Sequence, residues 1–324
     1  MTYSCIYIKA ILLYFYSGPV HSKYLKMGAY IITMSLSNRC LTCLKGVCGS
    51  VATLQVTESK EEEELKGLTY RKVLDLGQGA TGRVSLVIEE SSGDHLTCKA
   101  VSLTRKHKAE REVAVLRKLT GPHLPRFRDI SRTAESILIL TEYIPGRDLY
   151  VWYEGTSKRQ RRQLMSGYLK MMIVCLQELA ADGFVHLDIK PENFILSDDG
   201  KLKLIDLGCA HPIHSRPKQR LRSSAGTAGY SPPEIYTGYY HKNTDIWSLA
   251  VCVWTLYFGE RPFPDVGRKG EKITSTTFVF PTEYHNARLE RLPKALGDFM
   301  RSCLIFRPSR RMNIDQILTH ECVQ

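Results

Sequence analysis

One short stretch, His186–Asn193, constrains the fold of this chain more than any other part of the sequence. It contains Asp188, Lys190 and Asn193, and Asp206 follows thirteen residues after the asparagine. Carboxylate and amide oxygens are ligands that Mg²⁺ prefers, and a lysine can neutralise a phosphate. These side chains could orient a hydroxyl, bind a metal and screen a phosphate if they met in one small volume. The sequence therefore predicts a fold that brings the two segments together at one site.

Length and composition allow one large domain or two lobes with separate cores. The chain has 324 residues, 43% of them hydrophobic, so it can bury a substantial core and wholesale disorder is not expected. Its net charge of +12 favours acidic partners in general. No nucleic-acid-binding motif accompanies that charge, so we predict no nucleic-acid partner. The basic run Lys158–Arg162 is typical of a solvated helix face.

The ten cysteines have no regular spacing. Disulfide frameworks belong to short secreted chains, so we expect reduced thiols and an intracellular protein, cytoplasmic or nuclear. Cys40, Cys43 and Cys48 have a spacing that suggests zinc, but no fourth ligand lies near them in the sequence. We therefore predict no zinc site there.

Residues 1–67 are expected to form a poorly ordered N-terminal extension that ends in the acidic run Glu61–Glu64. Ile6–Val20 is apolar but interrupted, and it is too short to span a bilayer. It also lacks a basic region before it, so neither a signal peptide nor a membrane anchor is favoured. Met27 and Met34 offer alternative starts.

From residue 68 the pattern changes to strands and then to helices. Alternating or continuous apolar runs predict strands at Arg71–Leu76, Val84–Ile88, His95–Val101 and Ile137–Leu140, with a helix over Lys108–Leu119. Beyond residue 143 we expect helices over Arg159–Asp182, Thr244–Tyr257, Leu289–Leu304 and Ile314–His320, and short strands at Phe194–Leu196 and Leu202–Ile205. This order predicts an α+β fold with a sheet-rich lobe over 68–143 and a helical lobe over 144–322.

Three glycines, Gly77, Gly79 and Gly82, separate the first two predicted strands. Glycine allows backbone N–H groups to approach a phosphate without obstruction. The same spacing occurs in dinucleotide-binding folds, but there a helix follows the glycines directly. Here Val84–Ile88 is typical of a strand, which favours a phosphate-covering hairpin.

Taken in order, these motifs closely resemble those of eukaryotic-type serine/threonine protein kinases over residues 68–322. The stretch His186–Asn193 is similar to the family's H-R-D-x-x-x-x-N catalytic loop, and Asp206-Leu207-Gly208 is similar to its D-F-G. The resemblance implies a bilobal fold with a small β-rich N-lobe and a larger helical C-lobe. It also implies transfer of the γ-phosphate of MgATP to Ser or Thr hydroxyls of protein substrates. Lys190, two residues after Asp188, is typical of serine/threonine rather than tyrosine kinases.

The resemblance assigns roles to individual residues. Asp188 and Lys190 would be catalytic, the aspartate orienting the acceptor hydroxyl and the lysine offsetting charge on the phosphate. Asn193 and Asp206 would hold Mg²⁺. The residues implied for ATP are Gly77, Gly79, Gly82, Val84, Lys99, Glu112, Glu142, Tyr143, Asp148 and Ile195. Within that set Glu112 would pair with Lys99, and Glu110 is the competing candidate.

Two residues depart from the family pattern. Leu207 replaces Phe, and we expect it to remain an apolar plug against His186 and Leu116. Leu187 replaces the Arg that grips a phosphate on the activation loop. We therefore predict activity that does not depend on phosphorylation of that loop, although Ser223, Ser224 and Thr227 are available. The alternative is a pseudokinase scaffold that binds nucleotide or partner proteins without phosphoryl transfer.

Other matches concern the scaffold and the substrate. Gly226–Glu234 resembles the end of a kinase activation segment, which favours protein substrates over small molecules. The resemblance places Thr227 against Asp188 and Lys190, pairs Glu234 with Arg311, and directs Asp245 to the backbone of the catalytic loop. Asp148 and Glu192 suggest basic residues near the acceptor of the substrate.

Overall fold

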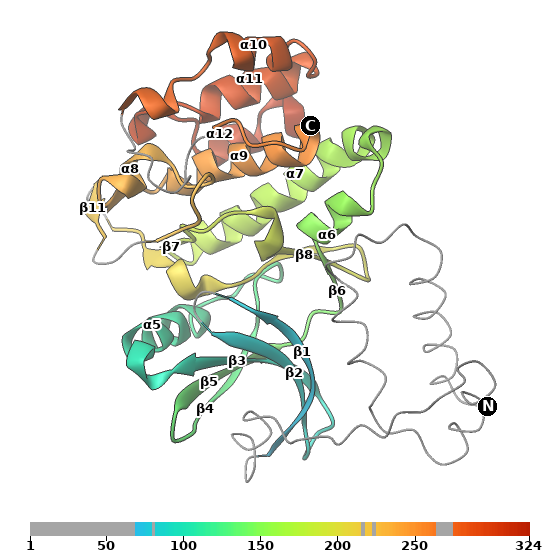
Figure 1. The fold of residues 1–324 in the computed structure, drawn as a ribbon, viewed down its shortest axis with the longest axis vertical. Coiled ribbons are helices and arrows are strands. Elements are labelled where there is room, and N and C mark those ends of the chain that lie inside the picture. Colours follow the sequence, from blue (N-terminus) through green and yellow to red (C-terminus); the bar gives the residue numbers. More distant parts are fainter. Residues whose placement is uncertain (1–68, 80–81, 215–217, 222–224, 264–274) are drawn as a thin grey trace, which may run out of the picture. The chain divides into compact units, whose positions relative to one another are not determined.

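The structure, a computed structural model, describes residues 69–79, 82–214, 218–221, 225–263 and 275–324 (Figure 1). All of these residues belong to the unit Glu58–Gln324. The predictions for residues 1–67, including the cysteine cluster and the apolar run Ile6–Val20, lie outside the described residues. So do Ser223 and Ser224.

The N-lobe is built on one antiparallel five-stranded sheet with strand order β1-β2-β3-β5-β4. Its strands are β1 (Tyr70–Gln78), β2 (Arg83–Glu89), β3 (His95–Ser102), β4 (Phe127–Arg132) and β5 (Ser136–Glu142). Four of them match the predicted strands. The sequence analysis missed β4, because its residues are mostly polar or only partly buried and it lies at the edge of the sheet.

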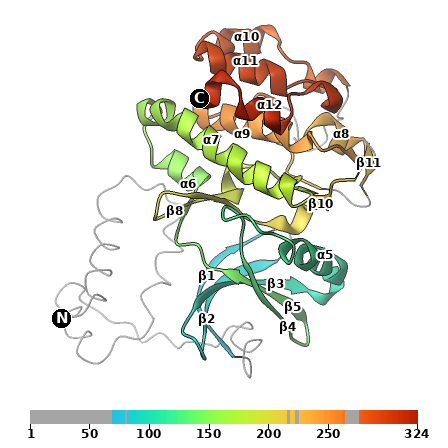
Figure 2. The same ribbon diagram turned by 180° about the vertical axis from the view of Figure 1, so that it is seen from behind.

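The alternation of side chains along β3 decides what each face of the sheet does. Leu96 and Cys98 are buried in a small apolar cluster on one face. Val101 belongs to the larger core on the other face, together with buried residues of helix α5 (Lys106–Leu116). Since neighbouring residues in a strand point to opposite faces, Lys99 shares the face of Val101 and is directed toward α5. Figures 1 and 2 show α5 against this face.

Helix α5 ends at Leu116, three residues before the predicted end. The chain then runs to the loop Gly121–Leu124, which docks on the C-lobe. Glu178 accepts a hydrogen bond from the His123 backbone N–H at 2.8 Å. A Cβ at Gly121 would lie 2.2 Å from the same carboxylate, so only glycine fits this contact. This loop gives the N-lobe an attachment to helix α7 in addition to the covalent connector between the lobes.

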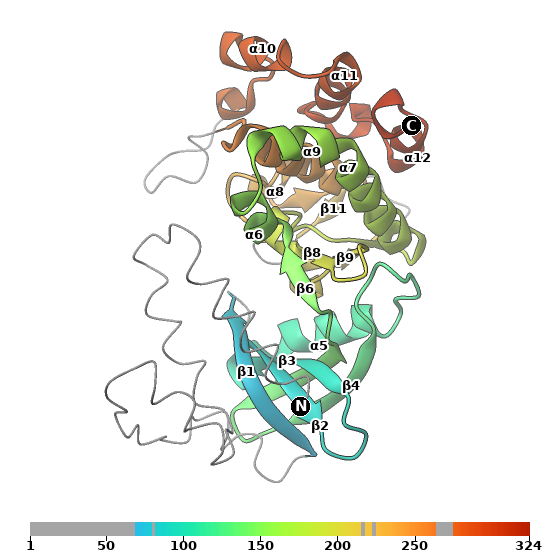
Figure 3. The same cartoon turned by 90° about the vertical axis from the view of Figure 1, so that its right-hand side faces the viewer.

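The C-lobe begins after the connector Tyr143–Pro145 and is mainly helical (Figure 3). Its longer helices are α6 (Leu149–Glu154), α7 (Lys158–Ala181), α9 (Thr244–Phe258), α10 (Glu283–Leu289) and α11 (Lys294–Cys303). Its shorter helical segments are η3 (Pro191–Asn193), η4 (Leu207–Cys209), α8 (Pro233–Tyr236), η5 (Ser275–Phe278), η6 (Pro308–Arg310), α12 (Ile314–Leu318) and η7 (Glu321–Val323). In the N-lobe, the short helical segment η2 (Leu103–Arg105) precedes α5. The remaining elements of the C-lobe are short strands. Its strands are β6 (Gly146–Asp148), β7 (Phe184–Val185), β8 (Phe194–Ser197), β9 (Leu202–Leu204), β10 (His211–Pro212), β11 (Gln219–Arg220) and β12 (Tyr239–Tyr240). The predicted α+β bilobal fold is confirmed.

One predicted helix was wrong. The sequence analysis expected a single helix over Leu289–Leu304, whereas Leu289 ends α10 and a new helix starts at Lys294. Pro293 separates them, because proline cannot donate the backbone hydrogen bond that would continue the first helix.

Helices α7 and α9 form the centre of the C-lobe core. Leu169, Met172 and Ile173 of α7 are fully buried, as are Trp247 and Trp254 of α9. By length and composition alone α7 could cross a membrane, but eight of its residues are buried in this core. The expectation of a fully solvated basic run at its start was wrong at one position. Arg161 is buried, with its guanidinium 3.9 Å from the centre of the Tyr153 ring.

The core position of α7 yields a stability prediction. We expect Leu169→Ala to lower the free energy of unfolding by about 2–5 kcal/mol, because it removes a fully buried side chain and leaves a cavity. Leu164→Ala, on the same helix but 46% exposed, should change it by less than about 1 kcal/mol. Denaturant titration of the two variants measures both values. Equal losses would contradict the assignment of α7 as a core helix with one solvated face.

Candidate active site

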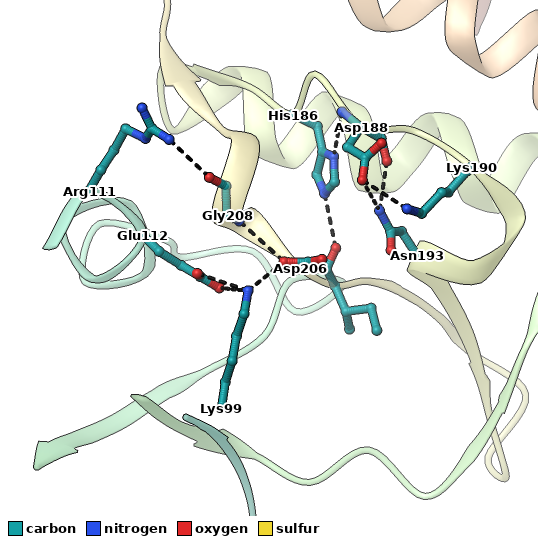
Figure 4. A network of polar contacts seen from close by, with 10 residues as sticks. Lys99, Arg111, Glu112, His186, Asp188, Lys190, Asn193, Asp206 and Gly208 are labelled. Carbon is teal, nitrogen blue, oxygen red and sulfur yellow. Dashed lines mark hydrogen bonds and ion pairs between the residues drawn. The ribbon is translucent and has the colours of Figure 1, made fainter. Parts of the chain in front are cut away.

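A lysine of the N-lobe joins two carboxylates that are distant in sequence. The Nζ atom of Lys99 on β3 lies 2.8 and 2.9 Å from the carboxylate oxygens of Glu112 on α5, and 2.7 Å from Oδ1 of Asp206 (Figure 4). Glu110, the competing candidate, is exposed and lies 3.6 Å from Lys106 instead. The geometry therefore assigns the helix carboxylate to Glu112.

The charges of Lys99 and Asp206 support each other, whereas burial raises the pKa of Glu112. Burial alone would lower the pKa of Lys99, but the Glu112 and Asp206 carboxylates outweigh it and raise that pKa above its ordinary value. Burial likewise would raise the pKa of Asp206, yet the charge of Lys99 and its hydrogen bond hold that pKa below its usual range. Lys99 and Asp206 are therefore both ionised at neutral pH.

Asp206 stands at the turn between β9 and η4 in a left-handed backbone conformation, with φ of +61°. Such a conformation is costly for a residue with a side chain and is often found at functional sites. The following Leu207 is buried in the same core cluster as Leu116 of α5, so leucine does serve as an apolar anchor for this turn. Arg111 adds a second link, since its Nη2 donates to the Gly208 carbonyl at 3.2 Å.

The second group of functional side chains surrounds Asp188. Thr227 donates to its Oδ1 at 2.6 Å, and Lys190 Nζ donates to its Oδ2 at 3.0 Å. Lys190 also donates to the Thr227 hydroxyl at 2.9 Å. The Asn193 amide donates to the Asp188 backbone carbonyl at 2.7 Å. Asp188, Lys190 and Thr227 are thus held in one geometry although Thr227 comes from a distant segment.

Asp245, at the start of α9, binds the backbone of the loop that carries Asp188. The Asp245 carboxylate accepts the backbone N–H groups of His186 and Leu187 at 2.6 and 2.8 Å. Leu187 has φ of +66°, a conformation that costs a branched residue energy, and the two hydrogen bonds fix it. His186 Nδ1 accepts the Asp188 N–H at 3.2 Å, so His186 Nε2 carries the proton donated to the Ile205 carbonyl at 2.9 Å.

A pocket of about 590 Å³ lies between the two lobes and joins the two groups. Thirteen of the fourteen residues predicted for the site line this pocket: Gly77, Gly79, Gly82, Val84, Lys99, Glu112, Glu142, Tyr143, Asp148, Lys190, Asn193, Ile195 and Asp206. The fourteenth, Asp188, is hydrogen-bonded to Lys190 beside the pocket. Val84 lies on β2 and Ile195 on β8, so apolar side chains from both lobes meet there.

The three glycines do not have the same reason to be glycine. A Cβ at Gly77 would meet no atom within 4 Å, and one at Gly79 would only touch the Gly82 carbonyl at 3.8 Å. These two positions leave room for a phosphate. A Cβ at Gly82 would lie 2.1 Å from the Ala100 carbonyl, so this glycine is required by the pairing of β2 with β3.

Two further pocket residues have part of their polar groups occupied. The Glu142 carboxylate forms an ion pair with Lys203, and its backbone N–H donates to the Arg126 carbonyl at 2.9 Å. That leaves its backbone carbonyl to contact a base. Asp148 caps α6 by accepting the Val151 N–H at Oδ1, and this cap does not use its Oδ2.

The oxygen donors near the phosphate end fit a magnesium ion. Asn193 uses its amide nitrogen toward Asp188 and keeps Oδ1 as an acceptor, and the described hydrogen bonds of Asp206 all use Oδ1 and leave Oδ2. Within the described ranges there is no cluster of three or more His, Cys, Asp or Glu side chains. Mg²⁺ is commonly bound by one or two carboxylates, with phosphates and water completing its shell.

The predicted ion pair between Glu234 and Arg311 is present. Arg311 holds the Glu234 carboxylate with two hydrogen bonds of 2.6 and 2.7 Å, and its side chain is completely buried. Sequence reasoning missed the contacts of Arg111 and Lys203. Neither residue belongs to a motif. Their partners, the Gly208 carbonyl and the Glu142 carboxylate, become their neighbours only in the folded chain.

The sequence matches the family described as Protein kinase domain over residues 70–323. It is 29% identical over 264 residues to calcium-dependent protein kinase 12 of Oryza sativa subsp. japonica, which covers 78% of this chain and 48% of that protein. It is 29% identical over 279 residues to serine/threonine-protein kinase dkf-1 of Caenorhabditis elegans, covering 81% of this chain and 38% of that one. A probable serine/threonine-protein kinase of Dictyostelium discoideum is 26% identical over 256 residues, covering 76% of this chain and 29% of that protein. The chain thus spans half or less of these relatives.

The two neighbouring glutamates of α5 provide a matched test. We expect Glu112→Gln to lower phosphoryl transfer about 10- to 100-fold, because Lys99 loses the charge that positions it. Glu110 lies two residues before Glu112 and is exposed, so Glu110→Gln should leave the rate unchanged. Steady-state assays of both variants decide the matter, and an equal loss in both would refute the special role of Glu112.

Proposed function

This chain belongs to the protein kinase family, and from that membership we propose that it transfers the γ-phosphate of ATP to Ser or Thr hydroxyls of protein substrates. The observation that carries the proposal is the connection of Lys99 to both Glu112 and Asp206, beside the Asp188–Lys190–Thr227 cluster. In this family protein phosphorylation requires ATP and a divalent metal. We propose Mg²⁺ as that metal, supported by the oxygen donors of Asn193 and Asp206.

Asp188 is the group that acts on the acceptor hydroxyl. Its carboxylate would accept the hydroxyl's hydrogen bond and take its proton as the new O–P bond forms. Thr227 and Lys190 already hold the two carboxylate oxygens, which restricts the aspartate to one orientation. Most of the catalytic benefit of such a site comes from positioning and from charge stabilisation.

Charge on the polyphosphate would be balanced by two lysines. Lys99 would bind the α- and β-phosphates from the N-lobe, exchanging its contact with Asp206 for the nucleotide, while Glu112 keeps its direction. Lys190 would offset charge on the phosphate in transfer. The metal, which Asn193 and Asp206 would hold, would supply positive charge to neutralise the phosphates. Gly77 and Gly79 have no side chain and leave space beside the backbone for the phosphates.

An Asp188→Asn variant separates this function from the pseudokinase alternative. We expect it to lose transfer of radiolabelled phosphate by about 10²- to 10⁴-fold, because the amide cannot accept the proton. Its affinity for ATP should stay within a few-fold of the wild type, because Asp188 lies beside rather than in the nucleotide pocket. No transfer by the wild-type chain, with nucleotide still bound, would support the scaffold function instead.

Substrate preference is a finer part of the proposal. Glu192 is exposed next to the catalytic loop, and Asp148 keeps one carboxylate oxygen unused by its helix cap. Both carboxylates support a preference for basic residues near the acceptor.

We expect Glu192→Gln to raise KM for an Arg-containing peptide about 3- to 10-fold, with kcat unchanged, because one charge contact is lost. For the same peptide with Gln in place of Arg, the wild type and the Glu192→Gln variant should have the same KM. A peptide array without any basic preference would remove this part of the proposal.

We also propose that activity does not depend on phosphorylation of the activation segment. Leu187, which stands where the family has an arginine, is buried in an apolar cluster with Val185, Leu221, Ile235 and Tyr240. Leu221 and the partly buried Ala225 lie on either side of residues 222–224. Burial of a leucine contributes about 1.5–3 kcal/mol, which can hold the segment without a phosphate.

Backbone hydrogen bonds support the same attachment. The Leu221 N–H donates to the Gly238 carbonyl at 2.9 Å, and β11 pairs with β12. The Tyr240 hydroxyl donates to the Pro212 carbonyl at 3.0 Å. The segment is thus held by apolar contacts on both sides of residues 222–224 and by main-chain pairing before them.

We expect phosphatase treatment, or the double change Ser223→Ala and Ser224→Ala, to leave kcat within about twofold of the untreated enzyme. Leu221→Ser should lower kcat severalfold, since it removes the apolar anchor while sparing every residue of the catalytic cluster. Both are measured with one peptide substrate. A collapse of activity after phosphatase treatment would sink the proposal.

An intracellular location, cytoplasmic or nuclear, completes the proposal. Its support is that the six cysteines in the described ranges are free thiols, five of them buried. Recovery of the tagged full chain from the medium of expressing cells would contradict it.

A further inference from the structure

A second hollow, of about 680 Å³, lies in the C-lobe and shares no residue with the nucleotide pocket. It is formed by the loop before α9, the end of α11 and the segment from η6 to α12, and we call it the basic groove. Its lining residues are His241, Lys242, Asn243, Arg301, Ser302, Ile305, Ser309, Arg310, Arg311, Met312, Asn313 and Gln316.

Three exposed cations from three different elements meet at the groove. Lys242 comes from the loop before α9, Arg301 from α11 and Arg310 from η6. In the part of the chain that the structure describes, none of the three forms an ion pair, and no carboxylate lines the groove. Like charges brought together without counter-ions repel one another, so this arrangement has a cost that an anionic ligand would remove.

The nearest acidic residues are engaged or face elsewhere. Asp298, three residues before Arg301, lies 2.7 Å from Lys294, which lowers the pKa of that carboxyl with a smaller contribution from the charge of Arg301. Asp315 lines a neighbouring hollow. Glu234 is held by the buried Arg311, and burial lowers the pKa of His241, so that the imidazole is neutral at pH 7. The net charge of the groove therefore comes from Lys242, Arg301 and Arg310.

The size and floor of the groove favour a peptide over a single anion. Its volume is within the range of roughly 300–1,000 Å³ that is usual for sites of extended ligands. Ile305 and Met312 add apolar surface, and the side chains of Ser302, Ser309 and Gln316 add hydrogen-bonding groups. An isolated phosphate would leave most of this lining uncontacted.

We propose that the basic groove docks an acidic segment of the protein substrate, at a distance from the phosphorylated residue. The proposal rests on the proposed kinase function and deepens it. The groove adjoins the Glu234–Arg311 ion pair, which anchors the end of the activation segment. The catalytic cleft presents the carboxylates of Asp148 and Glu192, so a substrate with basic residues at its acceptor and an acidic segment farther along would match both surfaces.

The binding step is tested without nucleotide, so that it does not depend on phosphoryl transfer. The probe is a short fluorescein-labelled peptide rich in Glu and Asp, without Ser, Thr or Tyr, titrated with the full chain and followed by fluorescence anisotropy. We expect binding that weakens with added salt. Charge reversal at Lys242→Glu, Arg301→Glu and Arg310→Glu should weaken it about 10-fold or more, since each change removes one contact and adds repulsion.

A matched control keeps the net charge equal. Lys158→Glu, Arg159→Glu and Lys170→Glu reverse three exposed cations of α7 that lie outside the groove, and peptide affinity should stay within about twofold. Thermal melting of both triple variants verifies that they fold. Equal losses in the two variants would attribute binding to net charge and overturn the proposal. Displacement of the peptide by inorganic phosphate at an equal concentration would overturn the peptide assignment.

A kinetic measurement links docking to function. A substrate peptide that carries the acidic segment should have a lower KM than the same peptide with Gln in its place, and groove charge reversal should abolish that difference without changing kcat. A KM that is insensitive to the acidic segment would overturn the docking function. Absence of any phosphoryl transfer, with anisotropy binding intact, would refute the proposed kinase activity and leave the groove as an acidic-peptide site.

Discussion

The structure of the site depends on one charge interaction, the contact of Lys99 with both Glu112 and Asp206. It joins a strand of the N-lobe, a helix packed on that strand, and a turn of the C-lobe. A buried ion pair contributes little net stability, because removing the charges from water offsets much of their attraction. Its contribution is geometric, since Lys99 can reach both partners only when α5 lies against the sheet and the Asp206 turn is docked. The position of the lysine therefore reports the arrangement of both lobes.

Two apolar substitutions in the motifs have different consequences. Leu207 keeps the burial expected of the residue it replaces and lies in the same core as Leu116. Leu187 changes the chemistry of its surroundings, because an arginine there would need an anion, whereas leucine needs apolar neighbours. Those neighbours are present in Val185, Leu221 and Tyr240. An apolar contact needs no modification, whereas an arginine–phosphate contact exists only after phosphorylation, and this difference is the basis of our proposal that activity does not depend on phosphorylation of the activation segment.

Charge is distributed unevenly over the C-lobe. Carboxylates lie beside the nucleotide pocket, while the exposed cations of the basic groove lie near the buried Arg311 and form no ion pair with any residue that the structure describes. Since surface charges act over about 10 Å at moderate salt, the two regions can attract oppositely charged parts of one extended substrate. In the sequence, the net charge of +12 pointed only to acidic partners in general. The structure shows that three of the exposed cations lie together at the basic groove.

The sequence by itself determined the fold class, most strands and helices, and which side chains meet at the candidate site. Periodicity of 2 or 3.6 residues is a local property, and the spacing from Asp188 to Asn193 and Asp206 is written directly in the chain. It did not reveal β4, whose polar residues resemble a loop, or the break at Pro293 within an otherwise apolar pattern. Only the tertiary structure decided between Glu110 and Glu112, showed that Gly82 lies too close to the Ala100 carbonyl for any side chain, and brought Arg111 to Gly208. It alone also brought Lys242, Arg301 and Arg310 to one groove. These outcomes depend on which segments become neighbours after packing, and a pattern along the chain carries no measure of distance between residues that are far apart in it.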